Sequence, residues 1–391
     1  MKRLWPIVVA AALIGLPAEA NESNHMLSEK EQTFITNVRE LFQAQDMVAQ
    51  GHRSGVAAQK AILARIRTFG EDTFATLPPS PAVAAALAGY VLSGGQPKFA
   101  EAYAANAALD DASRQLVESA AFFMSGSTSE AKVRLDRIEP TGLPAEIGGR
   151  VALARAMLAG DNEERRELEL SLAAALMPGT LIEESALRRS ALALAETDVS
   201  DRLWARTDRY VRRFSRSLYA AEYLTAIIRK LGKLAASGKH IDIHKLDYVL
   251  AALPTTVRRR LYLQLARETS ATTATSLAQA AARRLGRLSV LGSVEERLAY
   301  LYVSIHDIVG SNGVSAIARL KQIDQSGLDP NDIQLLKAAL VVAEQIQAPL
   351  PEPERLSDEI AAPLLEFQKR EQLGRNAIRL ADAALEETNQ E

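Results

Sequence analysis

The chain has 391 residues, of which 48% are hydrophobic, 24% charged and 5% aromatic. This balance is typical of a globular protein with an aliphatic core, and it excludes a disordered chain. The formal net charge of -2 excludes a general attraction to nucleic acid or anionic lipid. The absence of cysteine excludes disulfides, thiolate metal sites and cysteine nucleophiles.

Residues 1–20 have the pattern of a Sec-type signal peptide. Lys2 and Arg3 form a short positive region, residues 4–16 are apolar apart from one proline, and Ala18-Glu-Ala20 is an A-x-A cleavage pattern. The apolar run is shorter than the ~20 residues that a membrane-spanning helix needs. We therefore predict cleavage after Ala20 and release of the remaining chain into the periplasm.

The next segment, residues 21–56, is predicted to be an amphipathic helix. Its apolar positions share one side of the helix and are Phe34, Val38, Leu41, Phe42 and Met47. The helix is either a separate element or the N-terminal cap of the repeat array that follows. We favour the cap, because terminal repeats are usually atypical, but the sequence leaves open whether the helix docks on the array.

Residues 57–345 are predicted to form a helical-repeat domain. Apolar residues recur at helical spacing, strand patterns are absent, and helix ends close on Gly94, Gly126 and Gly160 at separations of 32 and 34 residues. A fourth helix end follows near Thr197. This is the period of tetratricopeptide repeats (TPR), so we predict an all-α fold, a degenerate TPR-like α-solenoid of antiparallel helix pairs. Unrelated antiparallel hairpins are the alternative, since the TPR consensus is not matched.

Capping boxes support this division into helices, because a Ser, Thr or Asp followed three residues later by Glu is typical of a helix start. The five pairs are Ser28/Glu31, Ser127/Glu130, Asp161/Glu164, Thr180/Glu183 and Ser293/Glu296. Near the C-terminus, Pro349, Pro351 and Pro353 predict a linker over residues 346–358, because proline cannot continue a helix. Residues 359–391 are expected to be helical again.

Motifs of catalysis are missing. Glu118 and Glu184 are each followed by serine, as in lytic transglycosylases, but the segment that follows the catalytic Glu in those enzymes is absent. His240 and His244 have the spacing of two ligands on one helix face, but no third ligand is evident. We therefore predict no enzyme, no cofactor and no metal site, and interpret the two histidines as surface residues near a helix start.

The strongest candidate for a binding surface is a row of arginines. Arg202, Arg206, Arg209, Arg213 and Arg216 recur at spacings of 4, 3, 4 and 3, which predicts one stripe along a helix. Trp204, between them, is a candidate aromatic anchor for a partner protein. The alternative is that acidic residues of this chain, such as Asp201, Asp208 or glutamates of a neighbouring repeat, neutralise the stripe.

Two runs of residues carry a family resemblance. Residues 185–190 (Ser-Ala-Leu-Arg-Arg-Ser) and 209–220 (Arg-Tyr-Val-Arg-Arg-Phe-Ser-Arg-Ser-Leu-Tyr-Ala), together with the signal peptide and the length, resemble the periplasmic motility protein MotC family of flagellated alphaproteobacteria. The resemblance implies a non-enzymatic component of the flagellar motor that binds the periplasmic part of the stator protein MotB. The alternative is a periplasmic helical-repeat scaffold that acts in cell-envelope or peptidoglycan assembly.

Overall fold

The computed structural model describes residues 27–106, 108–310, 312–347, 366 and 369–372. Over these ranges the chain is helical and contains no β-strand, which confirms the predicted all-α class. No helix in this part of the chain combines the length and the apolar character that a membrane span requires. The predicted signal peptide lies outside the described residues, as do most of the predicted linker and C-terminal segment.

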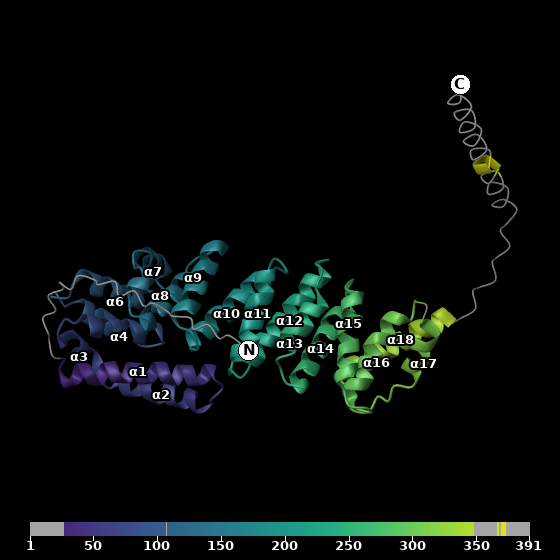
Figure 1. Ribbon diagram of the computed structural model, residues 1–391, viewed down its shortest axis with the longest axis horizontal. Helices are drawn as coiled ribbons and strands as arrows, with labels where there is room; N and C mark the ends of the chain where they lie inside the picture. Colours follow the sequence, from purple (N-terminus) through teal and green to yellow (C-terminus); the bar gives the residue numbers. More distant parts are fainter. Residues whose placement is uncertain (1–26, 107, 311, 348–365, 367–368, 373–391) are drawn as a thin grey trace, which may run out of the picture. The chain divides into compact units, whose positions relative to one another are not determined.

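The chain divides into two compact units, residues 1–288 (unit 1) and 289–391 (unit 2). The described part of unit 1 contains fifteen α-helices and one 3-10 helix (Figure 1). They are α1 (Glu29–Ala49), α2 (Ser54–Arg67), α3 (Gly70–Thr76), α4 (Pro81–Leu92), α5 (Pro97–Ala104), α6 (Asp111–Met124), α7 (Thr128–Leu135), η1 (Pro140–Gly142), α8 (Ala145–Met157), α9 (Glu163–Leu176), α10 (Leu181–Leu194), α11 (Asp201–Phe214), α12 (Ala220–Ala236), α13 (Ile243–Leu250), α14 (Thr255–Ser270) and α15 (Thr275–Leu288).

Unit 2 is smaller. Its helices are α16 (Val294–Asp307), α17 (Gly313–Lys321) and α18 (Pro330–Gln347), and α17 packs against both of the others. The buried Tyr302 hydroxyl donates to Asp332 Oδ1 at 2.5 Å, which joins α16 to the first turn of α18. α18 ends at Gln347, two residues into the segment predicted as a linker.

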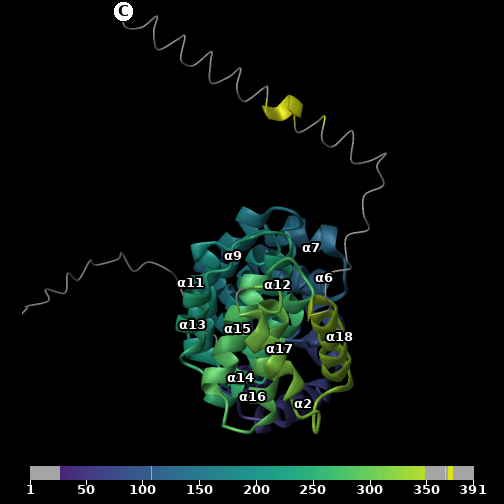
Figure 2. The same cartoon turned by 90° about the vertical axis from the view of Figure 1, so that its right-hand side faces the viewer.

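The contacts in unit 1 follow the pattern of a solenoid. Consecutive helices pack as pairs, as in α6 with α7, α8 with α9, α10 with α11 and α14 with α15. Several helices also pack on the next but one, as in α4 with α6, α11 with α13 and α12 with α14. Figure 2 shows α11 and α13 along one edge of unit 1. Such short-range contacts are expected when each repeat buries its apolar face on its neighbours.

Glycine ends the helices that set the predicted repeat spacing. α4, α6 and α8 stop just before Gly94, Gly126 and Gly160, whose φ angles are 95°, 83° and 57°. The Gly95 N–H donates to the Tyr90 carbonyl at 3.0 Å, which closes α4 in a Schellman turn. The left-handed backbone at these positions disfavours residues with a β-carbon. The predicted helix ends are therefore confirmed.

Four of the five predicted capping residues begin a helix. They are Ser28, Ser127, Thr180 and Ser293. The reciprocal box is complete at α1, where the Ser28 N–H donates to the Glu31 carboxylate at 2.8 Å and the Ser28 hydroxyl accepts the Glu31 N–H. The prediction at Asp161 is wrong by one residue, because Asn162 caps α9 and accepts the Arg165 N–H at 2.9 Å.

α1 docks on the array across a long stretch of it. Phe34 lies at 5.1 Å from Phe74, centroid to centroid, in the core shared with α4 and α5. Near the other end of α1, the Val48 carbonyl accepts the Leu218 N–H at 3.3 Å. α1 thus contacts α2, α4 and α10 and behaves as part of the array. The predicted boundary at residue 56 falls inside α2.

Two polar residues on α1 fix its position. Asp46 accepts the N–H of Leu181, at the start of α10, at 2.9 Å, and burial raises the pKa of Asp46 above its ordinary value. Gln45 accepts from the buried Arg150 guanidinium of α8 at 2.9 Å, and that guanidinium stacks 3.4 Å from the centre of the Phe42 ring. Burial lowers the pKa of Arg150 to about 10, so it remains charged at neutral pH.

Candidate partner interface around helix α11

α11 is a helix with two sharply different faces. The Ser200 hydroxyl caps it by accepting the Leu203 N–H at 3.3 Å. Its buried residues are Leu203, Trp204, Thr207, Tyr210, Val211 and Phe214, and the arginines lie on the remaining surface. An apolar face packed on α10 and α13 explains why so strongly charged a segment is helical, because tertiary burial outweighs repulsion between arginines.

The predicted arginine stripe exists over four of its five positions. Arg202, Arg206, Arg209 and Arg213 lie on α11, whereas the helix ends at Phe214 and Arg216 follows in the turn after it. The prediction that Arg216 continues the helical register is therefore wrong. Leu218, two residues later, donates its N–H to α1, so this turn is held by tertiary contacts.

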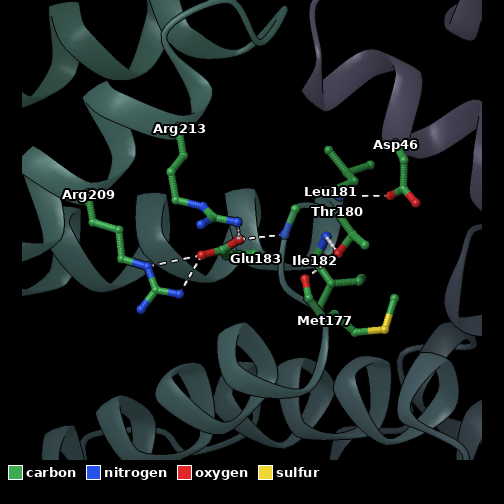
Figure 3. A network of polar contacts seen from close by, with 9 residues as sticks. Asp46, Met177, Thr180, Leu181, Ile182, Glu183, Arg209 and Arg213 are labelled. Atoms are coloured by element: carbon green, nitrogen blue, oxygen red, sulfur yellow. Dashed lines mark hydrogen bonds and ion pairs between the residues drawn. The ribbon is translucent and has the colours of Figure 1, made fainter. Parts of the chain in front are cut away.

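Glu183 of α10 binds two arginines of the stripe (Figure 3). Its Oε1 accepts from Arg209 Nε at 3.0 Å, and its Oε2 lies 3.0 Å from Arg213 Nη2. Oε2 also accepts the Gly179 N–H at 2.6 Å, just before the helix begins. The Glu183 side chain is 0% exposed, so this carboxylate is desolvated and relies on these three donors.

Glu167 of α9 holds Arg206 in the same way. Its Oε1 accepts from Arg206 Nε at 2.9 Å and Nη2 at 2.6 Å, while Ser171 accepts a further bond from Arg206 at 2.7 Å. The acidic partners thus come from the two preceding helices, and neither Asp201 nor Asp208 neutralises these arginines. Arg202 and Arg216 are exposed and have no ion-pair partner among the described residues.

The stripe keeps an excess of positive charge. Two carboxylates meet three guanidinium groups, and two further arginines are unpaired within the described part of the chain. The side chains of Arg209 and Arg213 are 42% and 43% exposed, so their outer N–H groups face solvent. This arrangement presents ordered donors that fit carboxylates of another molecule.

Trp204, predicted as an aromatic anchor between the arginines, is largely buried. It is 7% exposed, because it lies seven residues before Val211 and so shares the buried face. Trp204 lines a groove of about 410 Å³ between α11 and α13 together with Tyr248, which is 65% exposed.

A buried Glu-Tyr cluster beneath the stripe was not predicted. Glu184 of α10 is fully buried and accepts from the Tyr210 hydroxyl at 2.7 Å and from Arg188 Nε at 3.2 Å. Burial and then the Glu184 charge raise the pKa of Tyr210, so its hydroxyl stays a donor at all ordinary pH values. The cluster ties α10 to α11 and gives the stripe a rigid base.

The two histidines do not share a helix face. His240 lies in the loop before α13 and His244 in its first turn, with Asp242 as the N-cap between them, and both side chains are exposed. The Asp242 carboxylate accepts the backbone N–H of His244 at 2.8 Å and so caps the helix. Their predicted place near a helix start is confirmed. The described residues contain no group of three or more metal-ligating side chains.

Comparison with known proteins identifies the chain along nearly its whole length. The sequence profile described as "Chemotaxis protein MotC" matches residues 2–390. The protein named "Chemotaxis protein MotC" of Rhizobium meliloti (strain 1021) is 27% identical over 382 residues, which cover 92% of this chain and 84% of that relative. No solved structure matches. The resemblance found in the sequence is confirmed: the chain belongs to the chemotaxis protein MotC family, and its role is in motility.

Proposed function

We propose that this protein is a non-enzymatic, periplasmic component of the flagellar motor that binds the periplasmic region of the stator protein MotB and supports rotation. Membership of the MotC family supports a role in motility. The signal-peptide pattern of residues 1–20 supports export to the periplasm.

The observation that carries the binding proposal is the charge excess of the arginine stripe. Arginine forks suit bidentate contacts to carboxylates and are enriched at protein interfaces, where lysine is depleted. Four arginines of the stripe lie on α11, and Glu183 and Glu184 of α10 bind side chains of that helix. A partner with acidic side chains meets donors already held in place.

Reversing the charge of the two unpaired arginines tests the proposal without breaking an ion pair. Arg202→Glu/Arg216→Glu should slow association with the purified periplasmic region of MotB, measured by surface plasmon resonance, and weaken the salt dependence of that rate. The melting temperature should stay within about 2 °C of wild type, since exposed substitutions rarely exceed ~0.5 kcal/mol. The matched control is Arg260→Glu/Arg283→Glu, which changes two exposed arginines of α14 and α15. If both variants slowed association equally, the effect would come from net charge alone, and the arginine stripe would not be the binding surface.

A deletion strain tests the cellular role. We expect assembled flagella and impaired swimming, with the protein recovered in the periplasmic fraction and lost from it when residues 2–20 are removed. Mild crosslinking in cells should capture MotB. Capture of a peptidoglycan enzyme in its place, with normal swimming, would favour the alternative of a cell-envelope scaffold.

A further inference from the structure

A second basic site lies in a groove formed by α8, α9 and α10, whose lining contains no residue of the arginine stripe. The groove has a volume of about 490 Å³ and is formed by the end of α8, the middle of α9 and the C-terminal half of α10. Its lining residues are Ala156, Met157, Arg166, Leu170, Arg188, Arg189, Leu192, Ala193 and Glu196. This size is in the range of sites that enclose several side chains of a ligand.

Two of the three arginines in the groove have no carboxylate partner in the described part of the chain. Arg166 donates to the Gly160 carbonyl, and Arg189 Nε donates to the Ser185 hydroxyl at 3.3 Å. The third, Arg188, is bound to the buried Glu184.

The acidic residue of the groove does not neutralise these two arginines. Glu196 forms its ion pair with Lys230 of α12, outside the lining. The groove therefore holds two guanidinium groups that form no ion pair with a carboxylate of the described residues. Partial burial, followed by the charge of Arg188, lowers the pKa of Arg189, and the charge of a bound anion would act in the opposite direction.

The floor of the groove is aliphatic. Met157 is 50% exposed there, and Leu192 is half-buried beside it. Methionine adapts its shape to different apolar groups, which suits a surface that closes over a partner side chain. A concave site with an aliphatic floor fits inserted side chains better than it fits a flat lipid surface. A ligand that matches both the aliphatic floor and the arginines of the groove carries carboxylates next to aliphatic side chains.

We propose that this groove binds an acidic, aliphatic peptide segment of a partner protein. Carboxylates of the segment pair with Arg166 and Arg189, and a Leu-like side chain packs on Met157 and Leu192. The inference rests on the proposed function only in taking the partner to be a protein. It does not depend on the partner being MotB.

Peptide binding in solution tests the groove directly. The probe is fluorescein-labelled Glu-Leu-Glu-Leu-Glu-Leu-amide, and the comparison probe replaces each Glu by Gln. Fluorescence anisotropy with the full chain should show binding of the Glu peptide that weakens with salt, and at least ~10-fold weaker binding of the Gln peptide. Arg166→Gln/Arg189→Gln should weaken binding of the Glu peptide by ~10-fold or more. Met157→Gln should also weaken it, by a smaller factor.

The control is Arg260→Gln/Arg283→Gln, which removes the same charge from exposed arginines of α14 and α15 and should leave peptide binding unchanged. Circular dichroism and melting of each variant verify the fold. Equal loss in the control, or equal binding of the Glu and Gln peptides, overturns the proposal. The proposal is also overturned if the peptide fails to bind while the protein pellets with purified peptidoglycan and this pelleting requires Arg166 and Arg189. Each of these results leaves the MotB association assay with Arg202 and Arg216 unaffected, so the two ideas fail separately.

Discussion

Neutralising Glu183 should destabilise unit 1, because this carboxylate holds α10, α11 and the preceding turn together. Glu183→Gln keeps the size of the side chain and removes its charge, leaving Arg209 and Arg213 without an anion. Breaking a buried ion pair usually costs ~3–5 kcal/mol when the remaining charge stays buried. Here the two arginine side chains are 42% and 43% exposed and can turn toward water. We therefore expect a loss of about 2 kcal/mol in the free energy of unfolding.

The loss is measurable by urea unfolding followed by far-UV circular dichroism, as a lower midpoint with an unchanged slope. In a thermal melt it corresponds to about 4–8 °C. The matched control is Glu101→Gln, an exposed glutamate of α5 for which we expect a change within ~0.5 kcal/mol. A double-mutant cycle with Arg213→Gln should give a coupling of ~1 kcal/mol. If Glu183→Gln and Glu101→Gln proved equally stable and the coupling were zero, the stripe would not be anchored as described.

Three further variants probe other parts of unit 1. Arg206→Glu places a second carboxylate next to Glu167 and should lower the melting temperature by about 4–8 °C. MotB binding should fall only in proportion to the folded fraction, and an unchanged melting temperature with lost binding would contradict this. Burial raises the pKa of Asp46 above 3.8 in the fold, so the stability contributed by its protonated form is complete below pH ~3.8 and is lost as pH rises through the raised pKa. Asp46→Asn should therefore gain stability relative to wild type as pH rises from ~3 to ~7, measured by urea titrations. Gly51→Ala places a β-carbon 2.4 Å from the Arg216 carbonyl oxygen, at a residue whose φ is 93°. The change should lower the free energy of unfolding by ~2 kcal/mol or more. An unchanged melting temperature would show that the backbone around Gly51 shifts without cost.

Local chemistry made the helices and their ends predictable. Gly94, Gly126 and Gly160 end helices where expected because only glycine accepts the left-handed backbone of the closing turn without strain. The position of the stripe on α11 followed from the helical period alone. The same period carried the signal for Trp204, which shares a face with Val211, but the arginines on either side of it favoured the opposite interpretation.

The partners of the stripe were not predictable in the same way. Arg206 and Glu167 are 39 positions apart, and Arg209 and Glu183 are 26 apart. The helical period defines which residues share a face, but it carries no information on which helix that face meets. The docking of α1 on α10 is a stronger case, since the contact between Asp46 and Leu181 spans 135 positions and has no local signature.

Internal pairing of the stripe and recognition of a partner are compatible, and the geometry gives a reason why one assists the other. A free arginine side chain loses rotational freedom when it binds, which costs ~0.5–1.5 kcal/mol for each side chain immobilised at an interface. Arg206, Arg209 and Arg213 are already held by Glu167 and Glu183, yet the last two expose the outer edges of their guanidinium groups. A carboxylate that approaches those edges meets donors whose ordering the fold has already provided. The buried glutamates thus stabilise unit 1 and also hold the arginines of its surface in the conformation that binds a carboxylate. Glu183→Gln should therefore weaken MotB binding beyond its effect on folding, whereas Arg206→Glu should not.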